Sequence, residues 1–406
     1  MDANNGVGFN FREIEDRRLF STYQKYDLDL SRGLGARVWD TAGREYLDFM
    51  AGYGVAIMGH RHPEIVKALK DQLDKLMICH GSVYNEARAK FLDELFRVAP
   101  PQMSRVFLSN SGAEAVEVAL KLARKYTGKK EFIAFTGAYH GKTLGALSVT
   151  HAPKYRGSFA PLLQNVRFAS FGDIASLEAL DGSDVAAIIV EPVQGEGGVN
   201  IPSDDFLPAV EDKARRLGAL FIVDEIQSGL GRTGKWWAHQ HWKVEPDIMT
   251  LGKGIGGGIP MGATLAREDV ANSLKIGEQS TTMGGNPLAS VGGTSTLKLI
   301  GPMLDDINTK GAALLQGLRK IGEESRLVKE VRGKGLMLAI ELRVRFQDTL
   351  FEMLNEGMIS LYSGHTALRF LPPYVITQRD IDDALRITGS SIRKSESNAL
   401  SHQALT

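Results

Sequence analysis

The chain has 406 residues, of which 43% are hydrophobic and 24% are charged. This length exceeds the size at which a single hydrophobic core stops growing, so we expect two lobes. The 48 basic and 48 acidic residues give a formal net charge of +0, which argues against a protein that binds nucleic acid by overall charge.

The cysteine content and the N-terminal segment bear on cellular location. Cys79 is the single cysteine, so the chain cannot form an internal disulfide, and this fits a reducing cytoplasm. Residues 1–20 lack the apolar core of a signal peptide, and no apolar run reaches the length of a membrane span. Segments 60–62 and 239–241 carry histidines without clustered acid or thiol ligands. We therefore predict a cytoplasmic protein with no membrane partner and no metal site.

The N-terminal quarter is expected to hold a hairpin and two helices. Alternating apolar and polar residues with aromatics predict strands at 36–40 and 45–49 around a turn at 41–44. Apolar residues at helical spacing, with proline at the boundaries, predict amphipathic helices at 63–76 and 85–98.

A strand predicted at 105–110 leads into the segment Ser-Gly-Ala-Glu at 111–114. This segment is expected to form a capping box at the start of an apolar-striped helix that Gly128 ends. The N-terminus of such a helix offers unpaired amides and a positive dipole to an anion. A capping box alone is usually structural, so an anion site here depends on what the rest of the chain supplies.

Short apolar runs predict buried strands of a mostly parallel sheet at 132–135, 184–190, 219–223 and 248–251. Asp224 directly follows the third run, and Lys253 follows the fourth within a glycine-rich segment, 252–258. Ligands of open α/β sheets bind at the carboxyl ends of the strands. We therefore expect Asp224 and Lys253 to face the same crevice.

A buried aspartate and a lone lysine fit the chemistry of pyridoxal 5′-phosphate (PLP). The lysine amine bonds to the aldehyde of PLP, and the aspartate pairs with the protonated pyridine nitrogen, which keeps the ring an electron sink. For either residue alone, a strand-capping Asp or an exposed Lys is the simpler reading. A nucleotide P-loop is excluded because no Ser or Thr follows Lys253 and the glycine spacing is wrong.

The residues around this pair are more specific than the pair itself. DEIQSGLGRTG at 224–234, PDI at 246–248 and GKG at 252–254 together resemble the signature of the class III aminotransferases, which are fold-type-I PLP enzymes. The resemblance extends from about Val38 to Asp382. It implies an α/β fold with a large domain, built on a mostly parallel sheet flanked by helices, and a smaller α+β domain.

The resemblance also implies a domain division. It places an N-terminal segment of the small domain at 1–50, the large PLP-binding domain at 51–290 and the C-terminal small domain at 291–392. The polar composition of residues 393–406 predicts a disordered tail. In the C-terminal region the sequence predicts helices at 288–299 and 309–321, strands at 327–331 and 337–342, and a last helix from Thr377.

The resemblance assigns cofactor contacts along the whole chain. Lys253 would bond to the cofactor and move a proton between substrate and cofactor, while Asp224 would hold the ring nitrogen. Gln227 would hydrogen-bond the ring hydroxyl oxygen, and Tyr139 would stack on the ring. The phosphate contacts are assigned to Ser111, Gly112, Ala113 and Thr282. Because Thr282 would reach the phosphate of the neighbouring subunit, a homodimer whose active sites are completed by the neighbour is expected.

Substrate contacts follow from the same resemblance. Glu196 is expected to pair with Arg369 when the amine donor is bound and to swing away so that the guanidinium can clamp 2-oxoglutarate. Lys142 stands where relatives that act on ornithine-like donors carry arginine, and it keeps the charge without the bidentate fork. Further substrate contacts are expected from Tyr23, Tyr53 and Thr281.

Segments 191–199, 254–261 and 331–342 resemble the acetylornithine aminotransferases and their relatives that act on lysine or ornithine carried on a small acidic protein. This predicts transfer of the terminal amino group of an N2-blocked lysine or ornithine to 2-oxoglutarate, giving a semialdehyde and glutamate, in lysine or arginine biosynthesis. The alternatives are an aminotransferase for 4-aminobutyrate, another omega-amino acid or free ornithine, an aminomutase, and a non-catalytic relative of the fold.

Overall fold

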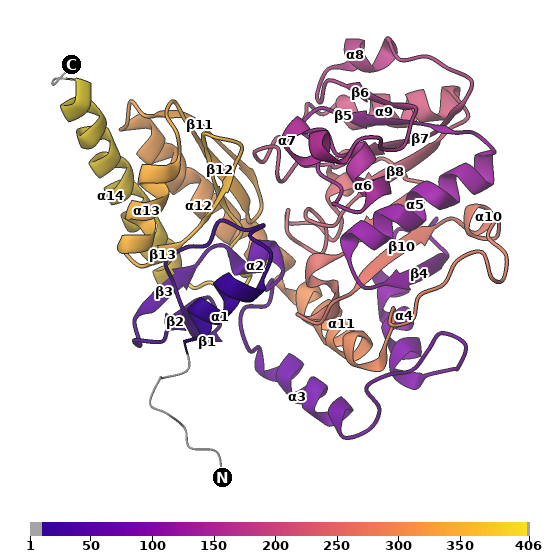
Figure 1. Ribbon diagram of the computed structural model, residues 1–406, viewed down its shortest axis with the longest axis horizontal. Helices are drawn as coiled ribbons and strands as arrows, with labels where there is room; N and C mark the ends of the chain where they lie inside the picture. Colours follow the sequence, from indigo (N-terminus) through magenta and orange to yellow (C-terminus); the bar gives the residue numbers. More distant parts are fainter. Residues whose placement is uncertain (1–9, 404–406) are drawn as a thin grey trace.

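The computed structural model describes residues 10–403, which form three sheets with helices around them (Figure 1). The large sheet has the strand order β4 (Arg105–Ser109), β10 (Gly262–Ala266), β9 (Ile248–Leu251), β8 (Leu220–Asp224), β7 (Val185–Val190), β5 (Glu131–Phe135) and β6 (Val166–Ala169). Strand β10 runs antiparallel to β4 and β9, and the other neighbouring pairs through β6 are parallel. This arrangement confirms the expected α/β fold with a mostly parallel sheet.

Two smaller sheets lie beside the large one, to its left in Figure 1. The N-terminal sheet consists of β1 (Leu30–Leu34), β2 (Arg37–Asp40), β3 (Glu45–Asp48) and β13 (Met358–Ile359), and the C-terminal sheet of β11 (Val328–Lys334), β12 (Met337–Leu342), β15 (Ala367–Phe370) and β14 (Leu361–Ser363). Strand β13 comes from the C-terminal region, so chain segments about 310 residues apart share the N-terminal sheet.

Helices cover these sheets and connect them. Those around the large sheet are α3 (Pro63–Leu73), α4 (Glu86–Val98), α5 (Gly112–Thr127), α6 (Leu144–Val149), α7 (Pro153–Arg156), α8 (Ile174–Glu178), α9 (Phe206–Arg216), α10 (Glu268–Ala271) and α11 (Pro287–Ile300). The others are α1 (Phe11–Arg18), α2 (Ala51–Gly54), α12 (Leu304–Glu323), α13 (Gln347–Asn355) and α14 (Gln378–Gln403). Short 3-10 turns are η1 (Gly157–Phe159), η2 (Ala238–His241), η3 (Lys253–Gly256) and η4 (Gly301–Met303).

The central strands are apolar throughout because helices cover both faces of the large sheet. Along β5, Phe132 packs in the core on the α5 side, whereas Ile133 packs on the α9 side with Phe206. Successive side chains of a strand point to opposite faces, so a strand covered on both sides buries every residue. All of β7 and β8 is buried, which explains the unbroken apolar runs in the sequence.

The predicted capping box at the start of α5 forms only in half. The Ser111 hydroxyl oxygen accepts a hydrogen bond from the Glu114 amide at 3.2 Å, as expected. The Glu114 carboxylate, however, accepts from the Asn110 amide and not from Ser111. At the other end Gly128 adopts a left-handed conformation with φ 71°, as predicted for a helix-ending glycine.

The predicted disordered tail is wrong for residues 393–403, because α14 continues to Gln403. The polar side chains of this segment find partners on neighbouring elements. Ser395 accepts a hydrogen bond from Thr349 of α13 at 2.9 Å, and Lys394 lies 2.8 Å from Glu356. Ile392 is fully buried. Residues 404–406 lie outside the described part of the chain, and within that part no helix is both long and apolar enough to cross a membrane.

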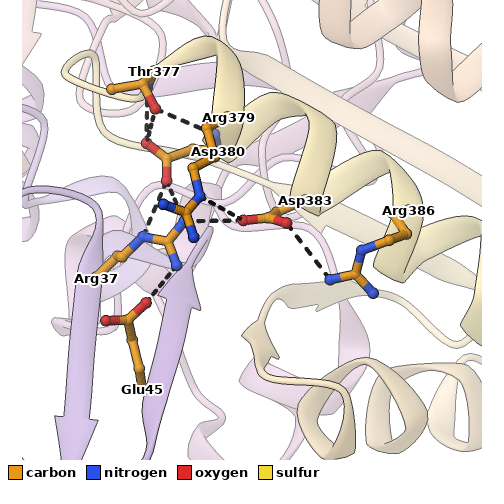
Figure 2. Close-up of polar contacts among 7 residues, drawn as sticks. All are labelled: Arg37, Glu45, Thr377, Arg379, Asp380, Asp383 and Arg386. Atoms are coloured by element: carbon orange, nitrogen blue, oxygen red, sulfur yellow. Dashed lines mark hydrogen bonds and ion pairs between the residues drawn. The ribbon is translucent and has the colours of Figure 1, made fainter.

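A cluster of charges ties the N-terminal hairpin to the start of α14 (Figure 2). The Arg37 guanidinium on β2 lies 2.7 Å from Asp380 and 3.1 Å from Asp383, and it also contacts Glu45. Asp380 accepts hydrogen bonds from the amide and the hydroxyl of Thr377 at 2.8 Å. Burial alone would raise the pKa of Asp380, but these hydrogen bonds and Arg37 together lower it.

Replacing Arg37 with methionine is expected to lower the free energy of unfolding by about 2 kcal/mol, because the nearly buried Asp380 carboxylate loses its cation. Urea unfolding at pH 7 measures this loss. Since the pKa of Asp380 is lowered in the folded state, its stabilising contribution is present at neutral pH and is lost as the pH falls below about 4. The difference between the two proteins should shrink over that range.

The matched control is Arg386→Met, since Arg386 lies 3.6 Å from Asp383 on the rim of the same cluster and its side chain is 63% exposed. Its loss should change the free energy of unfolding by less than about 0.5 kcal/mol. Equal effects of the two substitutions would show that the link between hairpin and helix contributes nothing of its own.

Candidate active site

Strand β8 delivers Asp224 to the carboxyl edge of the large sheet. The carboxylate is 3% exposed, its Oδ1 accepts from the Ile226 amide at 3.0 Å, and its Oδ2 lies 2.6 Å from Nδ1 of His140. Burial lowers the pKa of His140, but the hydrogen bond and charge of Asp224 outweigh it and raise the pKa. The pair is therefore a buried, hydrogen-bonded acid and imidazole.

Lys253 follows β9, the strand next to β8. Its backbone is left-handed, with φ 50°, and it begins the short turn η3. The preceding Gly252 packs against the start of α5, where a Cβ would lie 3.0 Å from the Gly112 Cα. Burial lowers the pKa of Lys253 despite nearby acids. A larger fraction of the amine is therefore neutral and able to act as a nucleophile.

A cavity of about 320 Å³ lies between these strand ends and the start of α5. It brings together a set of expected site residues: Gly112, Ala113, Tyr139, Lys142, Glu196, Asp224, Gln227 and Lys253. The amides of the first turn of α5 are the unpaired donors of a helix N-terminus. The sequence therefore located most of the cavity wall, although its members are up to 141 residues apart along the chain.

The loop after β5 carries Tyr139 and Lys142. Burial raises the pKa of Tyr139 to about 12, so its phenol is neutral. Its ring centroid is 5.5 Å from that of Tyr155 in an edge-to-face arrangement. Lys142 is exposed, and its Nζ lies 5.1 Å from the centroid of the Tyr155 ring. The ammonium thus sits over an aromatic face at the rim of the cavity.

Glu191 is a cavity residue that the sequence analysis missed. It follows β7, and its carboxylate accepts hydrogen bonds from the amide of Tyr139 at 3.0 Å and from that of Gly195 at 3.3 Å. Burial raises the pKa of Glu191 to about 7, even though His140 opposes the shift. An acid directly after a buried strand was the available signal, the same one that identified Asp224.

Arg369 lies on β15 of the C-terminal sheet and contacts two residues of the cavity wall. Its Nη2 lies 2.7 Å from Glu196, and its Nη1 donates to the amide oxygen of Gln227 at 3.1 Å. The Arg369 side chain is fully buried, and its Nε has no partner in the part of the chain that the structure describes. The expected ion pair is therefore present, and the same guanidinium contacts Gln227 of the cavity wall.

The other expected site residues lie outside the cavity wall. Tyr53 is 44% exposed, and Tyr362, Glu196 and Arg369 lie close enough to influence its pKa, which burial chiefly raises. Tyr23 is 83% exposed, and its charge contributes to the raised pKa of Tyr139.

The remaining three expected residues lie near the start of α5 or on the surface. Ser111 caps α5 with its side chain. Thr281 accepts a hydrogen bond from Asn110, the residue before Ser111, at 3.3 Å. Thr282 is exposed and does not line the cavity of its own chain.

The donor set fits PLP. The first turn of α5 offers amides to a phosphate, Asp224 is a buried anion suited to a protonated ring nitrogen, and Lys253 is a buried amine of lowered pKa. The cavity volume is within the ~300–1,000 Å³ typical of small-molecule sites. A side chain at position 112 would not fit in this turn, since a Cβ on Gly112 would lie 2.7 Å from Ile226.

Comparison with known proteins identifies the family. Residues 21–391 match the family model described as aminotransferase class-III. A [LysW]-aminoadipate semialdehyde/glutamate semialdehyde transaminase from Sulfolobus acidocaldarius is 42% identical over 95% of this chain and 100% of its own. An acetylornithine aminotransferase from Methanopyrus kandleri is also 42% identical, over 95% and 99%.

Among solved structures, the ornithine aminotransferase from Toxoplasma gondii superposes with a TM-score of 0.91 at 33% identity, covering 96% of this chain and 95% of that one. The match with the family model and the sequence relatives covers nearly the whole chain, as does this structural likeness. The chain belongs to the class-III aminotransferase family and is a PLP-dependent aminotransferase.

Proposed function

We propose that this enzyme moves the terminal amino group of an N2-blocked lysine or ornithine to 2-oxoglutarate, giving a semialdehyde and glutamate, in lysine or arginine biosynthesis. The observation that carries the proposal is the ion pair of Arg369 with Glu196, 2.7 Å apart, because Glu196 lines the same cavity as Lys253. The relatives with 42% identity are named for substrates of this kind.

The charge of the pair suits two different substrates in turn. While Glu196 neutralises Arg369, the site accepts a terminal amine that carries no nearby carboxylate. When Glu196 turns away, the buried Arg369 guanidinium loses its anionic partner and can bind the α-carboxylate of 2-oxoglutarate or glutamate. Glu196 has room to turn, because its side chain is 21% exposed whereas Arg369 is fixed by Gln227.

The proposed roles of the remaining residues follow from their positions. When bound, PLP supplies an electron sink for the reacting carbon of the amine. Lys253 would move a proton between that carbon and the cofactor, a role that its lowered pKa favours. Asp224 holds the ring nitrogen protonated, with His140 fixing the carboxylate at 2.6 Å. Gln227, Tyr139, Gly112 and Ala113 orient the ring and phosphate.

Positive charges near the rim of the cavity support the proposal that the donor is carried on an acidic protein. Lys142 and Lys154 place their ammonium groups 5.1 Å and 4.8 Å from the Tyr155 ring centroid. Two positive charges at the mouth attract an acidic partner and bias how it docks. Within the proposal, Lys142 takes the carboxylate of the donor as a single charge and not as a bidentate fork.

A homodimer is the proposed assembly. A surface segment at 73–84 exposes large apolar side chains, and Ile276 and Met283 are likewise exposed. Apolar surface of this extent usually marks an interface. A second copy would cover it and bring Thr282 to the neighbouring phosphate site. A monomer in sedimentation equilibrium that still retains PLP would contradict this assembly.

We infer a division at residues 1–50, 51–290 and 291–392, in which the first and third segments form the small domain. Strand β13, which joins the N-terminal sheet from the C-terminal region, supports this grouping. A cytoplasmic location is supported by the single cysteine.

The test is the visible absorbance of the PLP-loaded protein mixed separately with glutamate, ornithine, N-acetylornithine, 4-aminobutyrate and carrier-bound lysine. Glutamate and at least one N2-blocked donor should each bleach the band of the lysine-bound cofactor. A response to 4-aminobutyrate or free ornithine, with none to the blocked donors, would favour the corresponding alternative and overturn the proposed donor class.

A further inference from the structure

Residues 51–54 form a left-handed turn between β3 and the large sheet. The φ angles of Ala51, Gly52, Tyr53 and Gly54 are 48°, 61°, 61° and 80°. Glycine adopts such angles freely, but Ala51 and Tyr53 carry a Cβ that disfavours them. Non-glycine residues persist in this region only where the surroundings hold them. The turn therefore depends on contacts that fix it.

Asp48 supplies those contacts. It is the last residue of β3 and is 2% exposed. Its Oδ1 accepts hydrogen bonds from the amides of Met50 at 3.0 Å and Ala51 at 2.8 Å. Both amides lie at the entrance to the turn, where the backbone leaves the strand. One carboxylate oxygen thus fixes the start of the left-handed segment.

His60 holds the other oxygen of Asp48, with 2.7 Å between its Nε2 and Oδ2. The backbone of His60 is itself anchored to the hairpin, since its amide donates to the Gly35 carbonyl at 2.8 Å and its carbonyl accepts from the Gly35 amide at 2.9 Å. The ring packs on Gly33, where a Cβ would lie 2.7 Å from the His60 Cγ. Asp48 is therefore held from the hairpin side.

The turn carries Tyr53 to the substrate side of the molecule. The Tyr53 phenol lies close enough to Glu196 and Arg369 for their charges to influence its pKa, which burial chiefly raises. The chain just before the turn is tied to the end of the strand that bears Arg369, because the Leu371 amide donates to the Phe49 carbonyl at 2.8 Å. The backbone that leads into the turn and the strand that bears Arg369 are therefore held together by a hydrogen bond.

We propose that Asp48, held by His60, is the positioning residue for Tyr53: it fixes the left-handed turn 51–54 and thereby sets the affinity for the amine donor. The donor part rests on the proposed function, whereas the fixing of the turn does not. In this role Asp48 contacts neither substrate nor cofactor. It acts by fixing the position of the Tyr53 phenol.

Two measurements on PLP-loaded Asp48→Ala test the two parts. Hydrogen exchange of the amides in segment 49–56 should become at least about tenfold faster, because the capping oxygen is gone. The KM for N-acetylornithine, or for whichever terminal-amine donor bleaches the cofactor band, should rise about tenfold with kcat within about threefold, since a misplaced contact weakens binding. Asp48→Asn keeps an oxygen for both amides and should stay within about threefold of the parent in both measurements.

A double-mutant cycle with Tyr53→Ala shows whether Asp48 acts through Tyr53. Once the phenol is absent, adding Asp48→Ala should leave the donor KM unchanged within about twofold, so the two effects do not add. Should Asp48→Ala fail to fold, His60→Ala removes the same anchor from a partly exposed position and should show faster exchange and a smaller rise in KM. Asp40→Ala is the matched control: Asp40 accepts from the Arg44 amide at 2.8 Å and caps the hairpin turn at 41–44, so the donor KM should not change.

Unchanged exchange of segment 49–56 in both the Asp48 and the His60 variants would overturn the fixing of the turn, whatever the donor proves to be. Additive effects of Asp48→Ala and Tyr53→Ala on the donor KM would overturn the link to Tyr53. A parent enzyme that responds to glutamate and to no terminal amine would instead overturn the proposed function, and hydrogen exchange would still decide the role of Asp48 in the turn.

Discussion

Replacement of Lys253 with alanine is expected to lower the rate of the complete reaction by about 10⁴-fold, because the substitution removes both the group that bonds to PLP and the proposed acid–base group. The structure offers no substitute amine nearby. Among the described residues that line the cavity, Lys142 is the other lysine, and it is exposed and held over Tyr155. The Lys142 side chain is exposed to solvent, whereas burial lowers the pKa of Lys253.

The measurement is the rate of glutamate formation from a responsive donor and 2-oxoglutarate, with PLP retention followed by absorbance after gel filtration. Lys142→Ala is the matched control, since it removes a lysine from the same cavity. It should raise the donor KM and leave kcat within about tenfold. An unchanged rate for Lys253→Ala would exclude Lys253 from the chemistry and with it the central assignment of the site.

Replacement of Asp224 with asparagine is expected to lower kcat by about 10²–10³-fold, the size of effect seen when one preorganised electrostatic partner is removed from an active site. The carboxylate is 3% exposed and lies 2.6 Å from His140, so its charge acts at short range in a dry environment. Asparagine preserves the shape and removes the charge. The ring nitrogen of the cofactor then loses the anion that keeps it protonated.

Stopped-flow absorbance of the donor half-reaction measures this effect apart from turnover. Asp247→Asn is the matched control, because Asp247 accepts a hydrogen bond from the Phe221 amide at 2.8 Å just before β9, away from the carboxyl ends of the strands. It should change stability and leave kcat within about threefold. A similar kcat for Asp224→Asn and the parent would show that the buried carboxylate is structural.

Local patterns in the sequence located most elements of the fold. The helix predicted at 85–98 is observed at Glu86–Val98, and the strand predicted at 184–190 is observed at Val185–Val190. Strand β10 was not predicted, because its apolar run follows a glycine-rich turn and nothing local shows that it pairs antiparallel between β4 and β9. The helical tail was missed because its polar residues find their partners on segments far away in the sequence, near α13 and after α12.

In the candidate site, too, some residues could be found from local sequence patterns and others could not. Asp224 and Lys253 each stand at the end of an apolar run, a short-range pattern that chain order displays directly. Glu191 carries the same strand-end signal, but its hydrogen bonds to Tyr139 and Gly195 have no local signal. His140 could not be assigned from local patterns, since its significance lies in its contact with Asp224. The contact of Arg369 with Gln227 joins two sheets and likewise has no local signal.

The sequence by itself indicated the reaction class, because the segments around Asp224 and Lys253 resemble the class III aminotransferase signature and both residues follow predicted parallel strands, whose carboxyl ends share one sheet edge. The tertiary structure alone decided which charges are buried together. Burial lowers the pKa of Lys253 and raises that of Glu191, and the surrounding elements hold Tyr53 in a left-handed turn. Desolvation and close contact depend on every surrounding element, so neither can be read from neighbours along the chain.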